Sequence, residues 1–188
     1  AFLTWLALPV GIAASLLVLF APKSDTGALM LMGSALLIGF SMILDGLDGQ
    51  LARQTGQVSR WGDYLDHTLD RLLDAMWVIA IASSPAWVDD PALGWAAAWF
   101  TILGSYMGTQ AQAVSGGRNY KGFSRADRTI LTIAALAITG IFWLLDVQDY
   151  SAMPGMFDHL ELSPLTAVVF ISGLGGMYTF GIRFLQAR

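Results

Sequence analysis

Residues 45–70 read DGLDGQLARQTGQVSRWGDYLDHTLD and place carboxylates at helical spacing inside an otherwise apolar chain. Asp45 and Asp48 end one apolar segment, and Asp66 and Asp70 follow near the start of the next. A charged side chain at the centre of a bilayer costs about 2.5 kcal/mol or more, so such residues usually belong to a functional site. This stretch therefore decides both the fold class and where function is to be sought.

The composition of the chain is that of an integral membrane protein. Of its 188 residues, 55% are hydrophobic and only 13% are charged, and the mean hydropathy is +0.59. Soluble domains carry about 25% charged residues. We expect one domain over residues 1–188, no cleavable signal peptide, and a natural start upstream of Ala1. The absence of cysteine excludes disulfide and thiol chemistry.

Six apolar segments are long enough to cross a bilayer, which requires about 20 residues. They cover approximately residues 2–20, 27–54, 59–83, 93–114, 128–145 and 164–185. The sequence thus predicts an all-α integral membrane protein with six transmembrane helices. Localisation in the cell membrane as a multi-pass protein follows, with the lipid bilayer as a partner and no nucleic acid.

Basic residues predict the orientation, because they concentrate on the cytoplasmic side. They lie between the second and third segments, between the fourth and fifth, and at the C-terminus (Arg53, Arg60, Arg118, Lys121, Arg125, Arg128, Arg183 and Arg188). The loops of the opposite side hold Lys23 as their one basic residue, with seven carboxylates (Asp25, Asp89, Asp90, Asp146, Asp149, Asp158 and Glu161). We therefore expect both termini, and a polar cavity at residues 45–70, to face the cytoplasm.

The carboxylates of the motif are spaced to share helix faces, since residues three or four apart lie on one side. A turn near 55–58 predicts antiparallel neighbouring helices whose acidic faces meet. Oxygen ligands suit Mg²⁺, which also takes phosphate oxygens and water. Two such ions about 3.5–4 Å apart could clamp a phosphoryl group during its transfer.

The small residues of the motif would let a bulky ligand approach the backbone. Gly46, Gly49, Gly62 and Ala52 keep this region thin, and Arg53 could bind phosphate through its forked guanidinium. Glycines at this spacing also occur in plain helix packing, which stays an alternative for Gly46.

Three further polar residues of the third segment have structural interpretations. Asp63 suits the first turn of a helix, and Asp74 can pair with Arg71 three residues before it. His67 is turned from the carboxylate stripe by about 100°, so we do not expect it to be a ligand.

At these residues the sequence resembles the CDP-alcohol phosphotransferase family, whose signature is D-x2-D-G-x2-A-R-x8-G-x3-D-x3-D. All eight fixed positions are matched (Asp45, Asp48, Gly49, Ala52, Arg53, Gly62, Asp66 and Asp70). The six-segment layout is also similar to the family, although an amphipathic helix that often precedes the first span is not seen.

The resemblance implies transfer of a phosphatidyl- or archaetidyl-type group from a CDP-linked lipid to an acceptor alcohol, with release of CMP. It implies two divalent ions, Mg²⁺ or Mn²⁺, held by Asp45, Asp48, Asp66 and Asp70, with Asp70 as general base. Asp48, Gly49, Ala52, Arg53, Gly62 and Asp66 would form the nucleotide site. A homodimer is also implied.

The acceptor is the open point. Four basic residues within residues 118–128 favour an anionic acceptor, inositol phosphate or glycerol phosphate, although basic cytoplasmic loops arise without such a role. The segment 125–128 resembles inositol-phosphate synthases of the family. The candidate acceptor ligands are Arg128, Arg125, Lys121, Arg118 and Arg183. Gln110 and Gln112 stand where many such synthases have basic residues, and this stretch is more similar to archaeal members.

Other functions remain as alternatives. The acceptor could be neutral or zwitterionic, such as serine, inositol or choline. A divalent-cation transporter or channel would explain the carboxylates but not the fixed spacing of the glycines and Arg53. A membrane prenyltransferase typically needs about nine spans and widely separated Asp motifs, which this chain does not provide.

Overall fold

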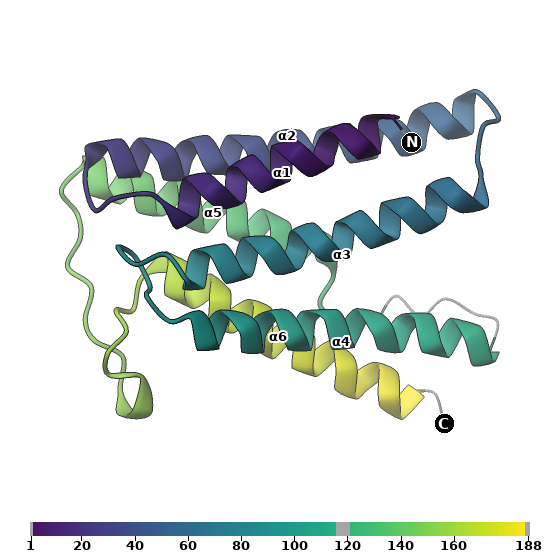
Figure 1. Cartoon of the computed structure of the whole chain (residues 1–188). Helices are drawn as coiled ribbons and strands as arrows, with labels where there is room; N and C mark the ends of the chain where they lie inside the picture. The colour runs from purple at the N-terminus through teal and green to yellow at the C-terminus, as the bar shows by residue number, and fades with distance from the viewer. Residues whose placement is uncertain (1, 116–120, 187–188) are drawn as a thin grey trace.

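The computed structural model describes residues 2–115 and 121–186, and within them it is a bundle of six α-helices (Figure 1). The helices are α1 (Phe2–Leu19), α2 (Asp25–Gln54), α3 (Arg60–Ala82), α4 (Pro91–Ser115), α5 (Arg125–Leu144) and α6 (Pro164–Gln186), with one 3₁₀ turn, η1 (Gly155–Phe157), before α6. Each of the six predicted segments is therefore a helix.

Serine caps set where three of the helices begin. The side chains of Ser24, Ser59 and Ser124 accept hydrogen bonds from backbone N–H groups of α2, α3 and α5. Such caps satisfy donors that the first turn leaves unpaired. Because of them α2 and α5 begin two and three residues earlier than the apolar pattern predicted, at Asp25 and Arg125.

Within the described residues, three helices are long and apolar enough to cross a membrane: Asp25–Gln54, Arg125–Leu144 and Pro164–Leu185. α1 carries a shorter apolar run, Leu3–Leu19. The first half of α3 is charged, which lowers its hydropathy. Large apolar side chains also face outward, among them Leu36, Trp99 and Phe20. Such a surface fits association with lipid.

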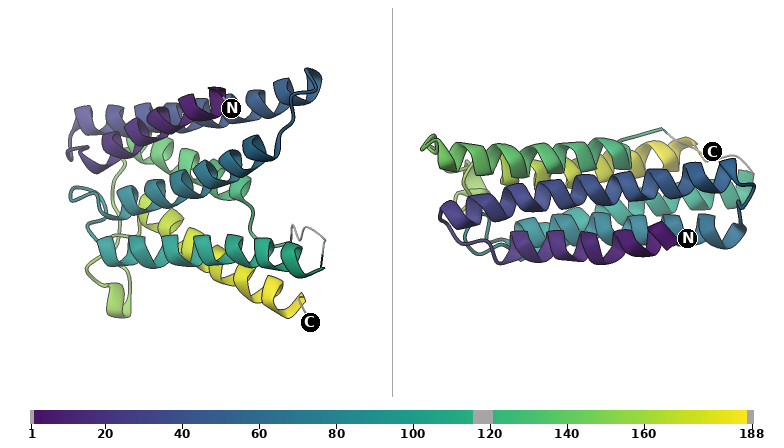
Figure 2. Two further views of the ribbon diagram at one scale, coloured as in Figure 1. Left: turned by 45° about the vertical axis from the view of Figure 1, so that its right-hand side comes forward. Right: turned by 90° about the horizontal axis from the view of Figure 1, so that it is seen from above.

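α1 packs against both α2 and α3, whereas α2 and α3 are not among the closely packed pairs. The other main contacts join α4 to α6, α2 to α5, and α3 to α4 (Figures 1 and 2). This differs from the prediction that the two motif helices are direct neighbours. Where the two helices approach each other, Asp45 of α2 meets Asp66 of α3, and such polar side chains offer little apolar surface to bury.

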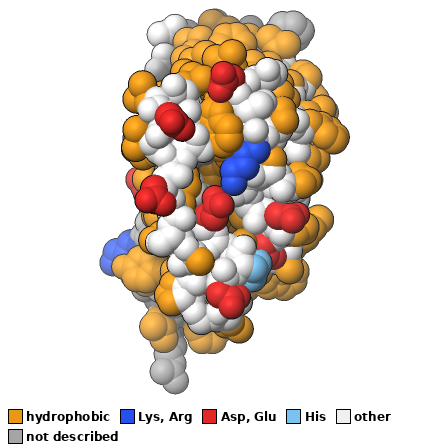
Figure 3. All heavy atoms as spheres, turned by 90° about the vertical axis from the view of Figure 1, so that its left-hand side faces the viewer, with side chains coloured by type: hydrophobic (Ala, Val, Ile, Leu, Met, Phe, Trp, Pro, Cys, Tyr) orange, Lys and Arg blue, Asp and Glu red, His pale blue; other side chains and the backbone are white. Residues whose placement is uncertain are grey.

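The end of the bundle opposite the motif is closed by the segment between α5 and α6. The backbone N–H of Met153 donates to the carbonyl of Leu160 beside the bridge between Ala152 and Glu161, and Leu160 is buried. Lys23 lies 3.4 Å from Glu161, joining this segment to the α1–α2 loop. Acidic side chains are spread over this face (Figure 3).

Candidate metal and phosphate site

Three of the four signature carboxylates, Asp45, Asp66 and Asp70, come together near the end of α2 and the start of α3. Asp66 of α3 lies within hydrogen-bonding range of Asp45 of α2. The hydroxyl of Thr4 in α1 donates to Oδ2 of Asp48. Asp70 is one turn further along α3 and is buried. The predicted convergence of the two acidic faces is therefore present, with α1 contributing a donor.

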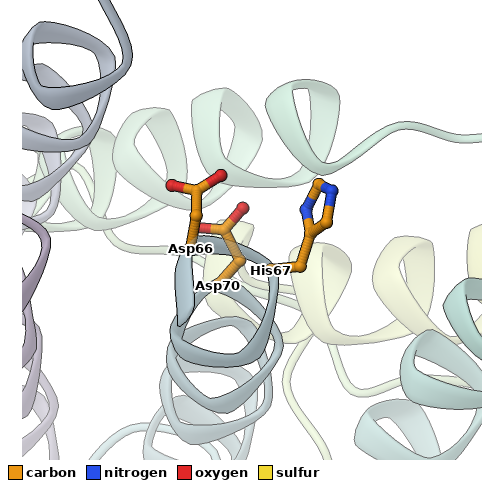
Figure 4. A group of neighbouring side chains, drawn as sticks. All are labelled: Asp66, His67 and Asp70. Atoms are coloured by element: carbon orange, nitrogen blue, oxygen red, sulfur yellow. The ribbon is translucent and has the colours of Figure 1, made fainter. Parts of the chain in front are cut away.

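Two of these carboxylates offer donor atoms for a cation. Ligand atoms of Asp66, His67 and Asp70 lie within 4.8 Å of one another. Figure 4 shows the carboxylates of Asp66 and Asp70 next to each other, with the His67 ring set apart from them. His67 Nε2 instead lies 3.6 Å from Oδ1 of Asp63. A set of carboxylate oxygens with Asp45 close by fits a hard divalent ion.

Gly46 and Gly49 border open space rather than a packed helix contact. A Cβ added at Gly46 would meet no atom within 4 Å, and one at Gly49 would meet Nη2 of Arg53 at 3.6 Å. This disfavours helix packing as the reason for Gly46. Ala52 is half-buried and Arg53 is exposed. Gly62 donates its N–H to the Ser59 cap, and an added Cβ would lie 3.2 Å from that hydroxyl.

Arg125 of α5 reaches into the carboxylate cluster. Its two Nη atoms lie 3.1 Å from Oδ2 of Asp45 and 2.8 Å from Oδ1 of Asp70. Its Nε donates to Oδ1 of Asp74 at 3.3 Å. One guanidinium thus joins α2, α3 and α5 at the site. Charge-assisted contacts of this kind are stronger than neutral hydrogen bonds.

The other candidate acceptor residues lie at the same end of the bundle, so far as the structure describes them. Arg128 is buried and donates to Asp74 at 2.9 Å. Arg183 of α6 donates to the backbone carbonyls of Lys121 and Gly104 and lies close enough to Arg128 and Arg71 to be repelled by them. The Lys121 residue is exposed. Arg118 lies outside the described residues.

Two contacts at the site were not predicted from the sequence, although Asp74 was expected on the acidic stripe of the third segment. Asp74, for which the sequence predicts a pairing with Arg71, is bound more closely by Arg125 and Arg128, while its distance to Arg71 Nη1 is 4.0 Å. Its position four residues after Asp70 was a usable signal. Thr4 carried no local signal, because its contact with Asp48 spans 44 positions.

Comparison with known proteins defines the class. A family model described as CDP-alcohol phosphatidyltransferase matches residues 1–172, and the chain belongs to this family. The predicted reaction class, a transferase acting on CDP-linked substrates, is thereby confirmed.

Among individual relatives, the phosphatidylinositol phosphate synthase of Cutibacterium acnes is 30% identical over 159 residues, covering 81% of this chain and 70% of that protein. The archaetidylinositol phosphate synthase of Pyrococcus horikoshii is 42% identical over 74 residues, covering 39% of this chain and 36% of that protein.

The fold is that of a solved membrane enzyme. The phosphatidylinositol phosphate synthase of Mycobacterium tuberculosis with CDP-DAG bound superimposes with a TM-score of 0.68 at 20% identity, covering 98% of this chain and 85% of that one. A second structure of that enzyme, in complex with manganese and citrate, gives a TM-score of 0.67 at 20% identity, covering 98% of this chain and 81% of that one.

Proposed function

We propose that this protein makes a phosphorylated inositol lipid: it transfers the phosphatidyl-type group of a CDP-linked lipid to inositol phosphate and releases CMP. The family supplies the reaction class. The bacterial and archaeal relatives are both named as inositol phosphate lipid synthases, which supports an anionic acceptor. Glycerol phosphate is the nearest alternative of the same charge.

In this proposal Asp45, Asp48, Asp66 and Asp70 hold two divalent ions, Mg²⁺ or Mn²⁺. The carboxylate donors on α2 and α3 fit such ions, and the solved relative binds manganese. When bound, the ions would act as Lewis acids on the diphosphate. The CMP portion would occupy the open space beside Gly46 and Gly49. The residues that border it are Gly49, Ala52, Arg53 and Gly62, together with Asp48 and Asp66.

Asp70 is the proposed general base. It accepts the proton of the acceptor hydroxyl as that oxygen forms a bond to the lipid-side phosphorus. The bond from this phosphorus to the bridging oxygen breaks, and CMP leaves with that oxygen. Its burial and its contact with Arg125, a proposed acceptor ligand, support this role.

The arginines beside the carboxylates are the observation that best supports an anionic acceptor. Two divalent ions would balance the four signature carboxylates. Among the described groups around these contacts, this leaves two carboxylates, Asp74 and the Asp127 that interacts with Arg128. They face four arginines: Arg71, Arg125, Arg128 and Arg183. The excess positive charge suits a phosphate monoester. Arg118 and Lys121 would extend the acceptor site from the loop.

The membrane arrangement belongs to the same proposal. All six helices cross the bilayer, and the carboxylate cavity and both termini face the cytoplasm. The basic residues at the site end and the acidic ones over the other face support this orientation (Figure 3). A homodimer is proposed from the family resemblance.

A panel of acceptors tests the proposed function. The purified chain in lipid nanodiscs would be given CDP-diacylglycerol, Mg²⁺ and, separately, inositol phosphate, glycerol phosphate, serine, inositol or choline. Inositol phosphate should give the highest kcat/KM for CMP release, together with a lipid product that retains the acceptor phosphate. Preference for a neutral acceptor would contradict the proposal. Cation flux without CMP release would favour a transporter.

A further inference from the structure

Asp74 is a buried carboxylate that the family signature does not include. Its side chain is 3% exposed and lies one helical turn beyond Asp70 in α3. Burying a carboxylate is costly unless it is paired. Here two guanidinium groups, those of Arg125 and Arg128, contact its two oxygens separately. The residue therefore joins the start of α5 to the middle of α3.

The contact with Arg125 determines which edge of that guanidinium faces the signature carboxylates. Nε of Arg125 is held by Oδ1 of Asp74 at 3.3 Å. The two Nη atoms are then directed at Asp45 and Asp70. Asp74 is the partner of Arg125 that lies outside the proposed metal ligands, so it can hold this arginine beside them.

The contact with Arg128 neutralises a charge deep in the bundle. Arg128 is 7% exposed, with Nη2 on Asp74 and Nη1 donating to the carbonyl of Phe123 at 3.2 Å. Its Nε has no hydrogen-bond partner among the described residues. Arg128 and Asp74 also line a cavity of about 10 Å³ together with Thr101, Thr129 and Thr132. That volume is close to the minimum for one water molecule, which could complete the bonding of Arg128.

We propose that Asp74 is a positioning residue for acceptor binding: it holds Arg125 and Arg128 so that their guanidinium groups face the acceptor phosphate beside the signature carboxylates. This inference rests on the proposed function. Asp74 itself touches neither substrate nor the reacting atoms. Its effect should therefore appear in the affinity for the acceptor and not in the affinity for the lipid donor.

The test compares Asp74→Asn with wild type in CMP-release kinetics at saturating Mg²⁺. The neutral amide keeps the volume of the side chain but removes the negative charge that pairs with the two arginines. The KM for inositol phosphate should rise at least about tenfold, as expected when an orienting partner is lost. The KM for CDP-diacylglycerol should stay within about twofold of wild type, on the same principle. Asp74→Glu, which restores the charge, should recover part of the acceptor affinity.

Asp63→Asn is the matched control, since Asp63 is an exposed aspartate of the same helix and lies 3.6 Å from His67 Nε2. It should leave the acceptor KM near the wild-type value. If Asp74→Asn does not fold, the double variant Asp74→Asn/Arg128→Gln removes both buried charges. It should fold, and its acceptor KM should exceed that of Arg128→Gln alone, because Arg125 has also lost its Asp74 partner.

Two results would overturn the inference. An unchanged acceptor KM in a folded Asp74 variant, or equal losses for donor and acceptor with a lower Tm, would make Asp74 purely structural. If wild type itself is not saturated by inositol phosphate or glycerol phosphate, the proposed function fails, and this inference fails with it.

Discussion

The two ends of the bundle carry many carboxylates but arrange them differently. At one end Asp45, Asp66 and Asp70 converge from α2 and α3, and Arg125 binds two of them. At the other end Glu161 pairs with Lys23, and both side chains are nearly half exposed. Convergence of several carboxylates on one guanidinium distinguishes the end of the proposed site, because Asp90 at the other end is as buried as Asp45 but pairs with His159. Substitution of an aspartate should therefore lower CMP release at the end where Asp45, Asp66 and Asp70 converge, and have little effect on it at the opposite end.

Substitution of a converging carboxylate should have the largest effect. Asp66→Asn removes a donor atom from the proposed metal site, and the loss of several kcal/mol of charge stabilisation corresponds to a rate reduced about a hundredfold or more. CMP release by purified variants at equal Mg²⁺ would measure it.

The contrast between the two ends would be wrong if substitution of a carboxylate at the opposite end lowered the rate of CMP release as much. Asp158→Asn, in the segment between α5 and α6, is the matched control and should leave the rate within about twofold of wild type, as is usual for surface substitutions. Similar losses in both variants would contradict the division between the two ends.

An intermediate effect is expected at Thr4, which orients Asp48 from α1. Thr4→Val keeps the shape of the side chain but removes the donor. Partners of metal ligands typically contribute 10- to 100-fold, so Mn²⁺ affinity should fall by about tenfold. Titration with Mn²⁺ by electron paramagnetic resonance measures this without relying on turnover.

Thr4→Ser, which retains the hydroxyl, should bind Mn²⁺ almost as wild type does. Equal losses in the valine and serine variants would show that the methyl group of Thr4, not its hydrogen bond, supports the site.

The smallest effect is expected at the Lys23–Glu161 pair. Exposed ion pairs contribute about 0–1 kcal/mol to the free energy of unfolding. Lys23→Gln should therefore lower Tm slightly and leave CMP release unchanged. A large loss of activity would mean that this end of the bundle takes part in the reaction.

The local features of this protein could be predicted from its sequence. The six helices follow from apolar runs, and the carboxylate convergence follows from i, i+4 spacing across a short turn. Each of these patterns lies within one continuous stretch of the sequence, so it can be detected without knowledge of the fold.

The remaining features depend on contacts between distant segments. Arg125 meets Asp45 across 80 positions and Asp74 across 51. The separation of α2 from α3 arises because α1 packs on both, which no local pattern encodes. A guanidinium in a basic loop is typical of any cytoplasmic surface, so its burial against three aspartates could only be found in the folded chain.

The most direct test of the central claim is CMP release from CDP-diacylglycerol with inositol phosphate, by wild type and by Asp70→Asn, each with Mg²⁺ and with EDTA. We expect CMP release that requires Mg²⁺ and whose rate falls by about 10²- to 10⁴-fold in the variant, the usual contribution of a general base. Release that persists in EDTA, or an Asp70→Asn variant as fast as wild type, would contradict it.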